Sequence, residues 1–210
     1  LAQKWMITKC NQAGKFVINA TQLLESMIGN PLPTRAEMTD VANSVFDGAD
    51  ATMLSGETAN GSDPPNACAT MARIAATTEL ACDYVAYSRD ISSKVVARTK
   101  AESTGLEVAT MARDSSISLV ICLSDNENIL QGITKCRPAA PVVVITTSAE
   151  LARFTGCLFG VFPCLVDGRA DVTVEAGVTA ARALNLVEGY GAGSAVLVDQ
   201  NLAVTVHRYR

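Results

Sequence analysis

The chain has 210 residues, of which 49% are hydrophobic and 18% are charged, and its formal net charge is −4. This composition supports a buried core and is unlike that of a disordered chain. The acidic balance offers no electrostatic attraction to nucleic acid or to an anionic membrane surface. The length allows one large domain or two small ones.

Three further features narrow the class of protein. The longest apolar runs are strand-sized, far below the roughly 20 residues of a membrane-spanning helix, so we expect no membrane association. The chain begins at Leu1 without a Met or a signal-peptide pattern, so we expect a fragment. Its seven cysteines form no C-x-x-C pair and His207 is the single histidine, so we expect reduced, buried thiols rather than disulfides or a zinc site.

The first 85 residues predict alternating strands and helices. The pattern predicts strands at 16–20 and 51–54 and helices at 34–47 and 64–85. Thr34 and Glu37 have the spacing of a capping box, and Gly48 closes the first helix. This order is typical of two βα units of a parallel sheet or a (β/α) barrel. Two parallel strands leave bare edges, so we expect further strands to come from elsewhere.

A mixed polar segment, 86–98, predicts a linker, and a second α/β pattern follows over 99–210. We expect five strands, at 119–123, 142–146, 160–166, 195–198 and 202–208. We expect helices between them, at 100–113, 128–135, 148–154 and 171–184, and a tight connection at 199–201. This is a complete small α/β domain with a five-stranded mixed sheet.

One stretch identifies a family. It reads Asn19-Ala-Thr-Gln-Leu-Leu-Glu-Ser-Met-Ile, then Pro33-Thr-Arg-Ala-Glu, Asp40-Val-Ala-Asn, Asp47-Gly-Ala-Asp and Met53-Leu-Ser-Gly-Glu-Thr-Ala-Asn-Gly61. In order and spacing it resembles the late barrel of pyruvate kinase, with small departures such as Asn60 where the family commonly has lysine. The rest of the chain resembles that family's C-terminal regulatory domain more loosely, through Lys135-Cys-Arg-Pro and Pro141-Val-Val-Val-Ile-Thr. The resemblance implies the last two βα units of a (β/α)8 barrel, over 1–85.

Polar residues follow both predicted barrel strands. Thr21 and Gln22 come directly after the first strand, and Ser55 and Glu57 directly after the second. Functional groups of a (β/α) barrel lie at the carboxyl ends of its strands, although local spacing alone favours hydroxyls that merely cap the next helix. The resemblance implies that Thr21 contacts substrate on the face where the enolate of pyruvate is protonated. It places Ser55 in the nearby water network and adds Gln22 and Glu57 to the substrate-binding loops.

The resemblance also implies what the complete enzyme needs. It would transfer phosphate from phosphoenolpyruvate to ADP in the cytoplasm, use Mg²⁺ and K⁺, and assemble as a homotetramer. The metal ligands and the phosphoryl-stabilising lysine come earlier in the family's sequence, so we expect no metal ligand here and no activity from this chain alone. Arg35 and Glu37 would lie at a subunit interface, although a simple capping box explains Glu37 equally.

Regulated members of the family bind sugar bisphosphates at a loop rich in Ser, Thr and Gly. Here that loop reads Ser124-Asp125-Asn126-Glu127-Asn128-Ile129, and the connection at 199–202 is short. Negative charge repels a phosphate, and Ile129 has no hydroxyl. We therefore expect no tight sugar-bisphosphate binding and a plain acidic turn in which Ser124 or Asp125 caps the next helix.

Two hypotheses remain open at this point. The chain is either part of a functional pyruvate kinase, completed by an N-terminal part in the same or another chain, or a truncated, non-catalytic relative that acts as a binding or scaffold module. Nucleotide binding by a Rossmann unit is disfavoured because no G-x-G-x-x-G follows a predicted strand.

Overall fold

The computed structural model divides into two compact units. One contains Leu1–Asn11 and Phe16–Asp83, and the other contains Gln12–Lys15 and Tyr84–Arg210. The structure describes residues 1–94, 96–97, 99–114, 116–187 and 192–210. In these described parts, no helix is both long enough and apolar enough to cross a membrane.

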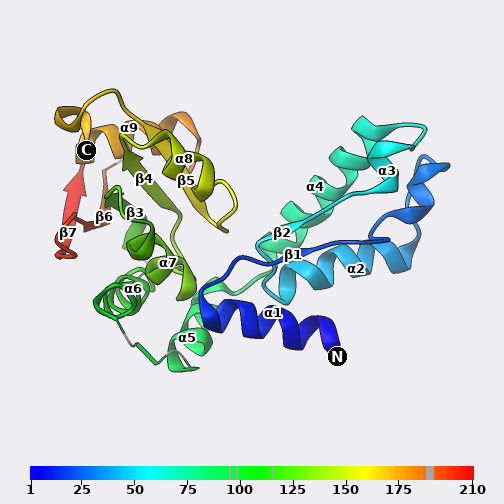
Figure 1. Ribbon diagram of the computed structural model, residues 1–210, viewed down its shortest axis with the longest axis horizontal. Helices are drawn as coiled ribbons and strands as arrows, with labels where there is room; N and C mark the ends of the chain where they lie inside the picture. Colours follow the sequence, from blue (N-terminus) through cyan, green and yellow to red (C-terminus); the bar gives the residue numbers. More distant parts are fainter. Residues whose placement is uncertain (95, 98, 115, 188–191) are drawn as a thin grey trace. The chain divides into compact units, whose positions relative to one another are not determined.

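The N-terminal unit alternates short strands with helices (Figure 1). It contains α1 (Ala2–Ala13) except for the last two residues of that helix, which belong to the other unit. Its further elements are β1 (Ile18–Asn19), the 3₁₀ turn η1 (Glu25–Ile28), α2 (Arg35–Phe46), β2 (Ala51–Thr52), α3 (Gly56–Ala59) and α4 (Pro64–Leu80). The two strands are parallel, with Ile18 opposite Ala51 and Asn19 opposite Thr52. Both strands are shorter than predicted. The backbone hydrogen bonds that define a strand need a neighbouring strand, and in this sheet each strand pairs only with the other.

Helix α2 forms as its sequence predicts. The Thr34 hydroxyl accepts from the Glu37 N–H, and the Glu37 carboxylate accepts from the Thr34 N–H, which completes the capping box. The chain then turns through Gly48, whose φ of +87° favours a residue without a Cβ. Helices α2 and α4 pack over a small apolar cluster formed by Leu23, Leu24, Met27, Val41, Ala67 and Met71.

The C-terminal unit is a five-stranded mixed sheet between helices. Its elements are α5 (Tyr84–Lys94), α6 (Lys100–Met111), β3 (Ile117–Leu123), α7 (Glu127–Lys135), β4 (Val142–Thr146), α8 (Ala149–Thr155), β5 (Val161–Leu165), η2 (Arg169–Asp171), α9 (Val174–Ala183), β6 (Gly193–Val198) and β7 (Val204–Tyr209). The strand order is β5-β4-β3-β6-β7, and only β7 is antiparallel to its neighbour. The predicted mixed sheet is therefore confirmed.

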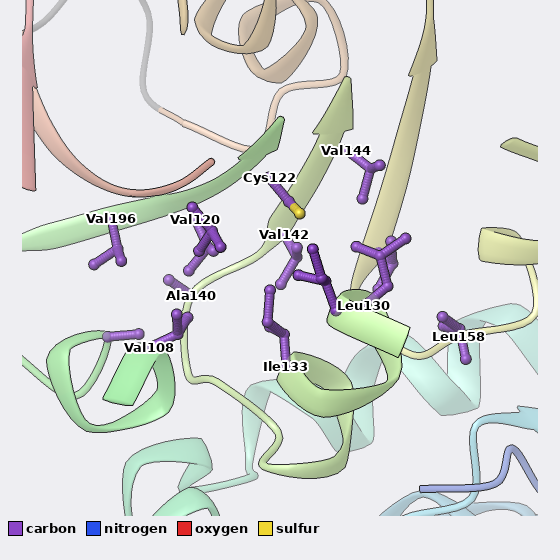
Figure 2. Close-up of a cluster of buried hydrophobic side chains, with 14 of the residues drawn as sticks. Val108, Val120, Cys122, Leu130, Ile133, Ala140, Val142, Val144, Leu158 and Val196 are labelled. Carbon is purple, nitrogen blue, oxygen red and sulfur yellow. The ribbon is translucent and has the colours of Figure 1, made fainter. Parts of the chain in front are cut away.

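Both faces of the central strands β3 and β4 are buried, as expected for central parallel strands. On β3, Val120 and Cys122 join the cluster beneath α6 and α7, whereas Leu119 and Ile121 join the opposite cluster with α9. Figure 2 shows Val120, Val142 and Val196 beside Val108 of α6 and Ile133 of α7. The alternation follows from the period of two along a strand.

Helices α6 and α7 approach each other at two glycines. A Cβ on Gly105 would lie 1.8 Å from the carbonyl oxygen of Gly132, and one on Gly132 would lie 2.3 Å from that of Ala101. Any side chain there would force the helices apart. Across the same pair of helices, Lys135 forms an ion pair with Glu102 at 2.6 Å.

The largest difference from the sequence prediction concerns residues 81–98. The sequence predicts that the helix beginning at Pro64 continues to residue 85 and that a linker covers 86–98. Instead α4 ends at Leu80, and Tyr84–Lys94 forms the separate helix α5. The buried hydroxyl of Ser88 donates to the Cys136 carbonyl oxygen at 3.2 Å, a long-range contact that local polarity does not reveal. Residues 95 and 98 lie outside the described residues.

Candidate functional site

The loops that follow β1 and β2 leave the sheet at the same edge. The strands are parallel, and the Met53 N–H donates to the Asn19 carbonyl oxygen at 2.9 Å just beyond the last pair. Thr21 therefore follows one strand and Ser55 the other at this shared carboxyl edge, and both residues are exposed. This is the edge at which barrel proteins place their functional groups.

The first of these loops begins in an unusual backbone conformation. Thr21 has φ of +78° and Gln22 has φ of +58°, both in the left-handed region. For a β-branched residue such as threonine this is a genuine outlier that costs about 1–3 kcal/mol. Such strain persists only where the surroundings enforce it, and it concentrates at functional sites.

Glu57 connects the two loops. This charged residue is only 1% exposed. One carboxylate oxygen accepts from the Leu24 N–H at 3.0 Å, and the other accepts from the Ser55 N–H at 2.8 Å. Burial acts to raise the pKa of this carboxyl group, but hydrogen bonds from the backbone of Ser55, Glu57 itself and Leu24 outweigh it, so the pKa lies below its usual value.

Glu37 holds the same loop further along. Its carboxylate accepts from the Ser26 N–H at 2.7 Å and hydroxyl at 2.5 Å, and from the Thr34 N–H at 2.7 Å and hydroxyl at 2.9 Å. Burial acts to raise the pKa of Glu37, but these four donors lower it overall. Neighbouring Arg35 is exposed at the start of α2. Whether Arg35 and Glu37 meet another subunit stays a prediction.

The loop at the carboxyl end of β3 differs from the turn that the sequence predicts. Asn126 caps α7, accepting from the Asn128 N–H, so the prediction that Ser124 or Asp125 is the cap is wrong. The Ser124 hydroxyl instead accepts from the Asn126 N–H at 3.0 Å, and Ile129 is buried in the core.

Asp125 is unavailable as a cap because the next strand's loop binds it. Its carboxylate accepts from the Thr146 hydroxyl at 2.5 Å, the Thr147 N–H at 3.1 Å and the Thr147 hydroxyl at 3.2 Å. The Thr146 hydroxyl is the strongest influence that lowers the pKa of Asp125; burial opposes it, and Thr147 and the charge of Arg169 add to the lowering. Glu127 and Asn128 are exposed in the first turn of α7.

The connection between β6 and β7 covers 199–203 and is longer than the predicted 199–201, because β7 begins only at Val204. The Asp199 carboxylate accepts from the N–H groups of Asn201 and Ala203, both at 2.8 Å, and Leu202 takes φ of +66°. The side chain of Asp199 thus closes a short turn of the kind that aspartate favours.

The remaining reactive groups form no second centre in the described parts of the chain. No three His, Cys, Asp or Glu side chains come together there as a metal site, and all seven cysteines are free. Burial raises the pKa of the Cys122 thiol to about 12 and that of Cys136 to about 11, which suppresses the reactive thiolate.

The C-terminal unit also has cavities of about 350 Å³ beside Lys135 and about 380 Å³ beside Arg182.

The fold and the first site together define a class: a parallel α/β protein with polar loops at the carboxyl ends of its strands. The model of the pyruvate kinase barrel domain matches residues 1–68, and the model of the pyruvate kinase alpha/beta domain matches residues 102–201. These matches cover most of the chain, which belongs to the pyruvate kinase family.

Individual relatives agree with this assignment. A pyruvate kinase of Clostridium acetobutylicum is 41% identical over 85% of this chain and 38% of its own length. That of Kluyveromyces lactis is 38% identical over 99% of this chain and 41% of its own length. A crystal structure of pyruvate kinase from Cryptosporidium parvum superposes with a TM-score of 0.91 at 37% identity, covering 99% of this chain and 43% of that one. The chain thus spans about two fifths of these relatives.

Proposed function

We propose that this chain provides the end of the catalytic barrel and the following α/β domain of a pyruvate kinase. Residues 1–85 would be the last two βα units of the barrel, 86–98 the connection, and 99–210 the regulatory domain. The observation that carries the proposal is the sequence from Asn19 to Gly61, supported by the barrel-domain match over residues 1–68. The complete enzyme would transfer phosphate from phosphoenolpyruvate to ADP, giving pyruvate and ATP in glycolysis, in the cytoplasm.

In this proposal, residues at the shared carboxyl edge position the three-carbon substrate. The exposed hydroxyl of Thr21 hydrogen-bonds the substrate on the face where the enolate is protonated, and Ser55 organises the water that takes part in that proton transfer. Gln22 completes the loop beside them. Phosphoryl transfer depends mainly on such positioning and on electrostatic stabilisation, so a fixed hydroxyl has catalytic value without becoming covalently bound.

The cations of the complete enzyme would bind outside this chain. Mg²⁺ and K⁺ are cofactors that membership of the family implies. The residues present do not fit such a site: Glu37 and Glu57 are occupied by N–H and O–H donors, and the described parts of the chain contain no cluster of metal ligands. A metal supplies charge neutralisation at the transferring phosphoryl group, and we propose that the N-terminal part of the barrel holds it.

A chimera tests this function. The N-terminal part of the Kluyveromyces lactis enzyme would be fused to this chain, which aligns with that enzyme over 209 residues. We expect pyruvate formation from the chimera, none from the 210-residue chain alone, and a loss of about 10²-fold or more in kcat for Thr21→Val, with Thr21→Ser retaining most activity. Turnover by the chain alone, or a fully active Thr21→Val chimera, would contradict the proposal.

A truncated binding or scaffold module is the alternative. It is favoured by the altered loop at Asp125. The mass of the native protein separates the two functions. A stable 22.0 kDa species without a companion supports the module. A longer polypeptide, or co-purification with an N-terminal pyruvate kinase chain, supports the enzyme.

We further propose that the loop from Ser124 to Ile129 does not bind sugar bisphosphates. The donors of Thr146 and Thr147 that could hold a phosphate are already occupied by the Asp125 carboxylate. We expect no calorimetric signal from fructose 1,6-bisphosphate at micromolar concentrations with the complete protein. Micromolar affinity would overturn this.

We also propose the homotetrameric assembly that family membership implies. Because the Glu37 carboxylate is engaged within its own unit, exposed Arg35 is the residue of the pair that is available to a second subunit. Equilibrium sedimentation of the complete enzyme with Arg35→Ala tests this; an unchanged tetramer would remove Arg35 from the interface.

A further inference from the structure

The loop that carries Thr21 has little regular structure of its own. Between β1 and α2 it contains only the four-residue turn η1, and it opens with two residues in the left-handed region. A strained, mostly irregular loop does not keep one conformation unless outside groups fix it. Side chains that contact this loop must therefore supply that constraint.

Its apolar side chains provide one support. Leu23, Leu24 and Met27 are buried in the cluster with Val41 of α2 and Met71 of α4. This anchors the middle of the loop, but apolar contacts are non-directional and set no register between this loop and the one that carries Ser55. A directional connection between the two loops is needed for that.

The Glu57 carboxylate provides this directional connection. It is a single rigid group, and its two oxygens accept from backbone N–H groups in different loops, Leu24 in one and Ser55 in the other. Because the donors belong to the backbone, the bonds fix the course of both loops and not merely two side chains. Charge-assisted hydrogen bonds of this kind are about twice as strong as neutral ones.

The surrounding chain is shaped to hold Glu57 in place. A Cβ on Gly61 would lie 2.1 Å from the Glu57 carbonyl oxygen, and one on Gly56 would lie 2.9 Å from Ile28 of η1. The Ser62 N–H donates to the Ile28 carbonyl oxygen at 2.9 Å, a second bond between the same two segments. Gly56 thus leaves room for the Ile28 side chain, Gly61 lets the chain fold back tightly onto α3, and the bond from Ser62 to Ile28 holds this segment against η1.

Only an ionised carboxylate satisfies both donors. A glutamine of the same size has one acceptor oxygen, and its NH₂ group would face an N–H. The nearby charge of Glu37 opposes ionisation of Glu57, because the negative charge of Glu37 acts to raise the pKa of Glu57. Two like charges around one short turn repel each other, and hydrogen bonds to both carboxylates offset this repulsion.

We propose that Glu57 is a positioning residue: it fixes the loop bearing Thr21 to the loop bearing Ser55, so that both hydroxyls keep their place at the barrel mouth. This refines the expectation that Glu57 contacts the substrate, because its carboxylate is buried and engaged by backbone. The effect on catalysis rests on the proposed pyruvate kinase function, whereas the effect on the two loops does not.

The first test needs no activity. In the 210-residue chain labelled with ¹⁵N, the amide signals of Leu24 and Ser55 should titrate together with the Glu57 carboxylate, and that of Ser26 with Glu37. In Glu57→Gln, hydrogen exchange at Leu24 or Ser55 should accelerate at least tenfold. The matched control is Glu25→Gln, an exposed acid in the same turn, which should leave both amides unchanged. Amides that do not follow Glu57 would overturn the proposal, even if Glu57→Gln fails to fold.

The second test uses the active chimera. Glu57→Gln should lower kcat about 10–100-fold and change the KM for phosphoenolpyruvate less, since misplacement by about 1 Å has effects of that size. Glu25→Gln should retain full activity. An unchanged kcat would overturn the proposal that Glu57 positions the two hydroxyls for catalysis. If the unsubstituted chimera is inactive, the proposed function fails, while the amide experiment still decides whether Glu57 connects the loops.

Discussion

The two units of the molecule are stabilised by different means. In the C-terminal unit, strands β3 and β4 bury side chains on both faces, and the helices pack on them in two apolar layers. The N-terminal unit has a two-stranded sheet, one small apolar cluster, and buried or half-buried carboxylates that hold its loops. Several of its large apolar side chains are exposed, namely Trp5, Phe16, Ile18, Leu32, Phe46, Met53 and Leu80.

The difference indicates which unit can fold by itself. A sheet whose two faces are already covered can fold by itself, whereas a two-stranded parallel sheet with exposed apolar neighbours requires more surface to bury. The carboxyl edge that carries Thr21 and Ser55 belongs to the two-stranded sheet. Its local geometry is fixed by hydrogen bonds to Glu37 and Glu57 and not by a deep core.

Separating the units should give the largest effect. We expect residues 84–210 alone to unfold cooperatively with a free energy of about 5–10 kcal/mol, and residues 1–83 alone to show no cooperative transition. Urea denaturation followed by far-UV circular dichroism measures both. A cooperative transition in the 1–83 piece would remove the contrast between the units.

Within the C-terminal unit, the contact between α6 and α7 should be the most sensitive point. Gly105→Ala places a Cβ at 1.8 Å from a carbonyl oxygen and should cost about 2–3 kcal/mol of unfolding free energy. The control is Gly156→Ala at the end of α8, where the new Cβ lies 3.4 Å from the nearest atom. Equal stability of the two variants would show that the helices can separate without cost.

Lowering the pH should change the stability of the protein less than separating the units or substituting Gly105 does. It tests the role of Glu37 and Glu57 in the N-terminal unit. The pKa values of Glu37 and Glu57 are lowered in the folded protein, so both carboxylates stabilise it above the usual value of 4.5, and this stabilisation is lost as the pH falls through the folded pKa values. Glu79, whose pKa is raised by burial, acts in the opposite direction. The difference in Tm between the unsubstituted chain and Glu37→Gln/Glu57→Gln should therefore narrow from pH 7 to pH 3.5. A constant difference would contradict this.

The sequence predicts local features well because their causes are local. The capping box of Thr34 and Glu37 spans three residues, and the alternation of β3 and β4 follows from their own side chains. The motif from Asn19 to Gly61 likewise identifies the family and the shared edge of Thr21 and Ser55.

Long-range bonds account for the features that the sequence does not predict. Glu57 accepts from Leu24, 33 positions away, so nothing near Glu57 indicates its second partner. Asp125 is bound by Thr146 and Thr147, more than 20 positions away, which leaves Asn126 to cap α7. In α5, the Ser88 hydroxyl likewise donates to the Cys136 carbonyl oxygen, 48 positions away.

The buried thiols of the C-terminal unit make its unfolding chemically measurable. Cys122 lies at the centre of the sheet and Cys136 at the end of α7, and neither ionises near neutral pH because burial raises the pKa of each. Cys68 and Cys157 are exposed and should be alkylated first. Once these are blocked, a second, isotopically heavier alkylating reagent would label Cys122 only in molecules whose central strand has opened. Mass spectrometry of the two labels would thus count the opening events of the sheet in a mixture, without a fluorophore or a binding partner.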